Sequence, residues 1–165
     1  MRKTIIECTL DKQDIDRAIK ELRAYKKEFL AREKRLIEGL AEIGLKEASV
    51  RFTTAMYDGT NDVSVHLDAI DNGYAIIADG QAVAFIEFGA GVYHNTSEPY
   101  PNPRPDGIVG IGEYGKGMGK RKAWGYENDD GEVVITRGNP AAMPMWYASE
   151  EIKNSVLKVV KEVFR

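Results

Sequence analysis

The chain has 165 residues, of which 43% are hydrophobic and 30% charged, a length that suits one hydrophobic core and is short for two. Its formal net charge is -3, which excludes a surface that is basic all round, as a general binder of nucleic acid or of an anionic membrane requires. We therefore expect a single domain over residues 1–165, with any basic contact confined to a local patch.

The sequence also indicates where the protein is kept. Cys8 is the sole cysteine, so no disulfide can form within the chain, and this suits a reducing compartment. We expect Cys8 to be a small buried residue, because no neighbouring residue in the sequence indicates that it is a nucleophile. Glu7 and Asp11 interrupt the first apolar residues, and no apolar run approaches the roughly 20 residues that cross a bilayer. The expectation is a cytoplasmic protein without a signal peptide or membrane contact, unless a particle carries it out.

The first predicted element is a long amphipathic helix over residues 11–43. Its apolar side chains recur at steps of three, four or seven, namely Ile15, Ile19, Leu22, Phe29, Leu36, Leu40 and Ile43. Asp11 is the expected N-cap and Gly44 the expected stop. At 1.5 Å per residue the helix spans about 50 Å, which exceeds the width of a domain of this size. Part of the apolar stripe is therefore expected to project, or the helix to bend at Gly39, and to contact a partner chain.

A sheet region is predicted over residues 49–88, where the apolar period changes. Residues 49–57 and 63–70 alternate apolar with polar side chains on either side of a turn-forming cluster, which indicates a β-hairpin. Residues 74–78 are a candidate further strand. The apolar run 82–88 fits a strand or a short buried helix equally well by pattern.

The second half of the chain is predicted as a loop, a hairpin and a helix. Residues 89–122 are rich in glycine and proline, which predicts a long flexible loop, and a loop of that length usually binds something. A hairpin is predicted over residues 122–137, around the turn residues 128–131. The last element is a C-terminal helix over residues 147–164, with valines and Ile152 on one face.

The glycine-rich stretch contains two partial nucleotide-binding motifs. Gly110, Gly112 and Gly115 have the spacing G-x-G-x-x-G of a dinucleotide site, but no strand-to-helix transition surrounds them. Gly110, Gly115 and Lys116 match most of a phosphate-binding loop, but Gly117 stands where a hydroxyl should coordinate magnesium. We expect no cofactor, and a nucleotide-binding enzyme that uses the loop from Gly110 to Lys116 stays as an alternative.

A basic patch follows in the same stretch and lies beside Trp124 and Tyr126. Its members are Lys116, Lys120, Arg121 and Lys122. Cations next to aromatic rings suit phosphate contacts and base stacking, so an adaptor that contacts nucleic acid is a second alternative. An acidic partner protein, or a loop in contact with solvent, explains the same four charges.

No catalytic or metal site is predicted. His66 and His94 lie far apart and only one cysteine is present, so no zinc-ligand spacing occurs. Glu87 stands among apolar residues and is a candidate buried acid. We expect it to pair with or cap another group, because no second carboxylate or base accompanies it.

Two groups of residues, taken in order, resemble a known family. The first is residues 85–91 with a histidine shortly after, and the second is residues 138–147 before the last helix, with an aromatic hairpin between them. This order resembles the tail-component family of long-tailed bacteriophages and prophages, whose aromatic-valine-glutamate-aromatic-glycine-threonine-glycine motif precedes such a hairpin and a proline-aromatic-methionine-tyrosine segment. The matching positions are Phe85, Glu87, Phe88, Gly89, Gly91, His94, Trp124, Tyr126, Gly138, Pro144, Trp146 and Tyr147. The sequence departs at Ala90, where threonine is usual, and at Met145, where phenylalanine is usual.

The resemblance implies both a fold and a role. The fold is α+β, with a small antiparallel sheet packed by the long N-terminal helix and the C-terminal helix, and with the Gly/Pro-rich loop and the hairpin inserted. The role is that of a structural virion protein, not an enzyme, in tail completion or head-tail joining. Copies are expected to form a ring-like homo-oligomer that docks to other tail, connector or head proteins, in the virion and in the host cytoplasm during assembly. In this role the long helix and the loop are expected to bind neighbouring subunits, with Trp124, Trp146 and Tyr147 as candidate anchor residues.

Overall fold

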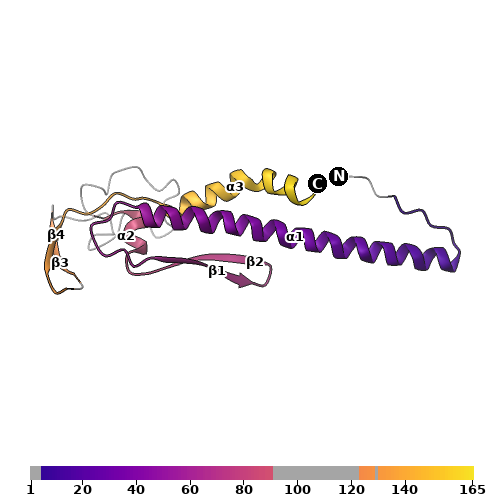
Figure 1. Cartoon of the computed structure of the whole chain (residues 1–165), viewed down its shortest axis with the longest axis horizontal. Coiled ribbons are helices and arrows are strands. Elements are labelled where there is room, and N and C mark those ends of the chain that lie inside the picture. Colours follow the sequence, from indigo (N-terminus) through magenta and orange to yellow (C-terminus); the bar gives the residue numbers. More distant parts are fainter. Residues whose placement is uncertain (1–4, 91–122, 129) are drawn as a thin grey trace.

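The computed structural model describes residues 5–90, 123–128 and 130–165, and Figure 1 shows an elongated molecule built along one long helix. The elements are α1 (Lys12–Thr54), β1 (Ser64–Ile70), β2 (Gly73–Asp79), α2 (Val83–Phe88), β3 (Trp124–Glu127), β4 (Val133–Thr136) and α3 (Pro144–Val163). Both α3 and the β1–β2 hairpin pack on α1, while the N-terminal part of α1 extends past them (Figure 1). The expected α+β fold is confirmed, with the difference that the strands form two separate two-stranded antiparallel sheets.

Helix α1 begins where the sequence predicts and ends later. The carboxylate of Asp11 accepts the backbone N–H of Gln13 at 3.0 Å, which is the expected N-cap. Gly44 does not end the helix, so that prediction is wrong. A Cβ at Gly44 would lie 2.5 Å from the Cδ1 methyls of both Ile152 and Ile76, so glycine is needed where α1 approaches α3 and β2. The helix continues to Thr54 and its N-terminal part projects without support from these elements.

One of the two strands of the first predicted hairpin is confirmed, since residues 63–70 contain β1, and the other is wrong. Residues 49–54 are the last turns of α1, with Ala48 and Phe52 buried, so the prediction of a strand over residues 49–57 is wrong. The hydroxyl of Ser49 donates to the carbonyl four residues earlier, which lets a polar residue remain in the helix. The actual hairpin pairs β1 with β2 and is closed between Ile70 and Gly73, so the candidate strand over residues 74–78 is confirmed.

The other elements agree more closely with the sequence. The apolar run over residues 82–88, which fitted strand or helix, forms the short helix α2. The predicted second hairpin is present as β3 and β4, with Glu127 opposite Val133 next to the turn. In that turn the side-chain oxygen of Asn128 accepts the backbone N–H of Asp130 and of Glu132, which fixes the loop.

The core lies near the C-terminal end of α1. Phe52, Ala82 and Ile86 are its fully buried residues, and Val65 of β1 and Met145 of α3 pack against them. By contrast, residues 5–10 lie outside the core: Leu10 is 98% exposed, and Cys8 is exposed, so the prediction of a buried Cys8 is wrong. Within the same segment Ile5 is also exposed and Ile6 is half-buried. Among the described residues, no helix combines the length and apolarity that crossing a membrane requires.

Candidate functional site

Glu87 connects α2 to the start of α3. Its side chain is only 4% exposed; Oε2 accepts the backbone N–H of Met145 at 2.8 Å and Oε1 accepts that of Trp146 at 3.1 Å. These N–H groups belong to the first turn of α3, where the helix itself provides no acceptors. The N-cap residue Met143 has a left-handed backbone, with φ 50°, and its side chain makes no capping bond. Glu87 therefore caps α3 from another element, which is the type of role that the sequence predicted for it.

The residues after Met143 fix α3 against α1. Pro144 is fully buried at the first position of the helix, where its missing N–H costs nothing. The rings of Trp146 and Tyr147 meet edge to face with centroids 4.8 Å apart, and the guanidinium of Arg51 lies 3.7 Å from the centroid of the Tyr147 ring. Tyr147, a candidate anchor for neighbouring copies, is thus engaged by α1 of its own chain.

The two groups of motif residues, far apart in the sequence, are joined through their backbones. The N–H of Ala90 donates to Asn139 at 2.9 Å and the N–H of Asn139 donates back to Ala90 at 3.1 Å. Gly89 has φ 72°, and a Cβ there would lie 2.7 Å from the backbone nitrogen of Ala141. Glycine is therefore required at this crossing for both conformation and space. Gly138, with φ 91°, donates its N–H to the hydroxyl of Thr136 at 2.8 Å.

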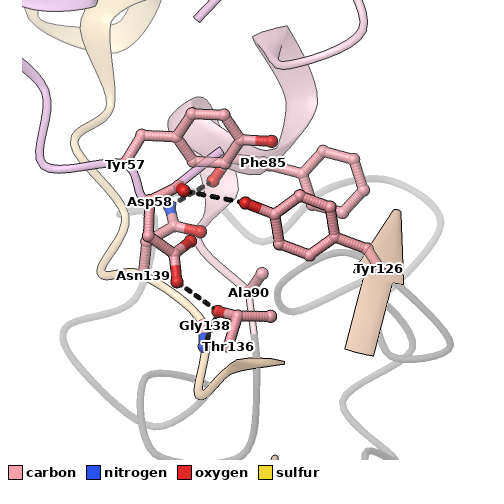
Figure 2. A pocket seen from close by; sticks show the side chains of 8 residues that line it. All are labelled: Tyr57, Asp58, Phe85, Ala90, Tyr126, Thr136, Gly138 and Asn139. Carbon is pink, nitrogen blue, oxygen red and sulfur yellow. Dashed lines mark hydrogen bonds between the residues drawn. The ribbon is translucent and has the colours of Figure 1, made fainter. Parts of the chain in front are cut away.

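A pocket of about 190 Å³ lies beside this crossing, and Figure 2 shows the side chains around it. Its lining comes from the segment after α1, from α2 and from the second hairpin: Tyr57, Asp58, Phe85, Ala90, Tyr126, Thr136, Gly138 and Asn139. The polar groups bond to one another. The hydroxyl of Tyr126 donates to the carbonyl of Asp58 at 2.8 Å, and the hydroxyl of Thr136 donates to the Asp58 carboxylate. The amide of Asn139 donates to the carbonyl of Phe85 at 2.8 Å.

These contacts make the pocket a joint between elements. Burial raises the pKa of the Tyr57 phenol, and burial together with the charge of Asp58 raises the pKa of Tyr126. Both phenols therefore stay protonated at neutral pH, and that of Tyr126 serves as a hydrogen-bond donor to Asp58. The bonds from Tyr126 and Thr136 hold the β3–β4 hairpin to the connection between α1 and β1.

Asp62 is a second distant cap, which sequence reasoning missed. Its carboxylate accepts the N–H of Gln81 at 2.7 Å and that of Ala82 at 2.9 Å, just before α2. The hydrogen bonds from Ala82 and then Gln81 lower the pKa of Asp62 below its ordinary value of 3.8. The cluster over residues 58–62 was predicted as a hairpin turn; its acidic residues instead tie α2 and the second hairpin to the end of α1. The sequence feature that could have indicated this role is the number of side chains in residues 58–62 that can accept hydrogen bonds from backbone N–H groups.

Gly91, His94, the loop from Gly110 to Lys116 and the rest of the basic patch (Lys120, Arg121 and Lys122) lie outside the described residues, as does the side chain of Trp124. Within the described ranges, no group of three or more His, Cys, Asp or Glu side chains is arranged to hold a metal ion.

The projecting part of α1 carries an exposed apolar stripe, called here the α1 stripe and formed by Ile15, Ile19, Leu22 and Phe29. Their exposed fractions are 38%, 41%, 55% and 42% respectively. The ring of Phe164, just after α3, meets that of Phe29 with centroids 5.8 Å apart. This contact marks where α3 stops covering α1. From Ile15 to Phe29, about 21 Å of α1 presents this stripe to solvent.

Comparison of the chain with family models, with curated proteins and with solved structures found no match.

Proposed function

We propose that this chain is a structural virion protein of a phage or prophage, a tail-completion or head-tail joining component. It acts by ring-like self-assembly and by docking to neighbouring particle proteins, without catalysis. The observation that carries the proposal is the α1 stripe, an apolar face about 21 Å long that projects beyond the core of its own chain. A contiguous apolar surface of this kind marks an interaction site on a soluble protein.

The motif residues support the same function. Glu87, Gly89 and Asn139 join α2, the segment before α3 and α3 itself into one unit at the end of α1. Glu87 and Gly89 are among the positions on which the resemblance to the tail-component family rests, and their contacts fix the orientation of α3 relative to α2. A subunit of a particle needs such a fixed body, so that the part that projects reaches its neighbour at a defined angle.

The composition of purified particles tests this proposal. Particles are collected on a density gradient from an induced culture of the organism that carries the gene, and their proteins are identified and quantified by mass spectrometry. We expect this chain to band with the tail and head proteins in a fixed number of copies per particle. An abundant cytoplasmic enzyme of the host serves as the contamination control. Recovery of the chain with that enzyme and not with the particles would refute the proposal.

A further inference from the structure

The α1 stripe has the spacing of a helix-pairing seam. Ile15, Ile19, Leu22, Lys26 and Phe29 are separated by steps of four and three, which keeps them on one side of the helix as the core positions of a heptad repeat are kept. Their exposure shows that no described element of the chain covers this seam near its N-terminal end. In the segment before α1, Ile5 and Leu10 are exposed and Ile6 is half-buried, while the small side chain of Ala18, at the edge of the seam, is 9% exposed. The larger side chains of the seam are thus left exposed by the described part of this segment.

The charges beside the seam are divided along its length. Residues 11–16 contain three aspartates and one lysine, Asp11, Lys12, Asp14 and Asp16. Residues 23–28 contain three cations and one acid, Arg23, Lys26, Lys27 and Glu28. Two such helices that run in the same direction place like charges together, whereas antiparallel helices place the acidic part of each against the basic part of the other.

Two flanking residues point to the register. Asp16 and Arg23 are seven residues apart, directly beside the seam, so they occupy equivalent heptad positions. Both are exposed, and neither makes an ion pair within the part of the chain that the structure describes. In an antiparallel pair such equivalent positions face each other, and a two-fold axis near Lys20 brings each Asp16 beside the partner's Arg23.

We infer that α1 of a second copy covers the α1 stripe, in an antiparallel pair whose two-fold axis passes near Lys20. About 20 residues of helix per copy bury on the order of 1,000 Å² in total, at the low end for specific interfaces. The dimer therefore forms in the micromolar range and is a state of the free protein. Because the contact is two-fold and closes at two copies, assembly of a ring needs other surfaces or the opening of this pair. The inference therefore goes beyond the proposed function, and both use the α1 stripe.

Sedimentation equilibrium of the full chain from 1 to about 200 μM tests the existence of the dimer. The variant Leu22→Asp places a charge in the seam, and we expect it to raise the dissociation constant at least about tenfold. The matched control is Ala24→Asp, which adds the same charge to an exposed position on the opposite face of the helix and should leave the dimer intact. Circular dichroism checks that both variants keep their helix content. A wild-type chain that remains monomeric throughout overturns the inference.

Cross-linking tests the direction of the pair. In a Cys8→Ser background, a single cysteine at Ile19→Cys lies near the two-fold axis, whereas the same change at Ile15→Cys lies about 16 Å along the axis from its counterpart. A short bismaleimide should join the Ile19→Cys copies and leave the Ile15→Cys copies largely unreacted. Equal cross-linking at both positions indicates parallel helices and overturns the inference.

Charge exchange provides an independent check. Asp16→Arg and Arg23→Asp should each weaken the dimer about threefold or more, and the double variant should restore it, because each pair is re-formed with reversed charges. A double variant no better than the single ones contradicts the register. If the chain is monomeric but Leu22→Asp prevents its incorporation into particles, another protein covers the α1 stripe. That result refutes the antiparallel pair and leaves the proposed function standing.

Discussion

Removal of the Glu87 carboxylate should destabilise the fold more than any surface change of similar size. In Glu87→Ala, the N–H groups of Met145 and Trp146 lose a charged acceptor in a buried setting. Hydrogen bonds to charged groups contribute about 1.5–3 kcal/mol each, and an unsatisfied buried donor costs about 1–3 kcal/mol. Since these two terms overlap, we expect the free energy of unfolding to fall by about 3 kcal/mol. Glu87→Gln keeps one acceptor oxygen and should cost about half as much.

Urea titration followed by far-ultraviolet circular dichroism measures this loss. For a chain of this size, 3 kcal/mol moves the midpoint by about 1 M urea or more, well beyond experimental error. The matched control is Glu162→Ala, an exposed acid near the C-terminal end of α3, the helix that Glu87 caps, and it should change the midpoint little. If Glu87→Ala unfolds within about 0.5 kcal/mol of the wild type, Glu87 does not hold α3 and the account of the joint is wrong.

Three further predictions concern single positions in the fold. Gly44→Ala should lower the free energy of unfolding by about 1 kcal/mol, because the added Cβ meets two isoleucine methyls. Gly39→Ala should raise it by up to about 1 kcal/mol through helix propensity, because the nearest atom to its Cβ is 3.4 Å away. Thermal unfolding compares the two variants. Gly89→Ala should cost about 2 kcal/mol or more in urea titration, since φ 72° and the contact with Ala141 both exclude a side chain, and an unchanged midpoint would contradict the crossing. Because folding lowers the pKa of Asp62, the stabilisation from its carboxylate is present above pH about 3.8 and is lost as the pH falls below that value. Asp62→Asn should therefore flatten the acidic part of a profile of melting temperature measured from pH 7 to 2.5. A profile identical to that of the wild type would count against the cap.

The sequence predicted elements where one pattern dominated. Asp11 before an apolar period marked the start of α1, and the Asn-Asp-Asp-Gly turn marked the second hairpin, because both features act locally. Gly44 misled the prediction for a reason that is not local. Glycine commonly ends a helix, but here the absence of a side chain makes room for two isoleucines from α3 and β2. This close packing of Gly44 against the isoleucines exists only after folding.

The first hairpin was misassigned because two patterns coexist in the same residues. Residues 49–57 alternate apolar with polar, yet Gly44, Ala48 and Phe52 also continue the helical step of four. A two-residue turn between Ile70 and Gly73 was the better hairpin signal, and it was passed over. At the site, the capping role of Glu87 followed from its apolar surroundings. The hydrogen-bond partners of Asp58, Asp62 and Asn139 could not be predicted from the sequence in this way. They lie 19 or more residues away, and their positions depend on how the chain crosses itself.

Deletion of the gene, followed by electron microscopy and an infectivity assay of the particles, tests the central claim most directly. The account predicts that heads and tails accumulate unjoined or that tails remain unfinished, and that supplying the wild-type chain restores complete particles. Complete and infectious particles in normal yield without the chain would contradict it.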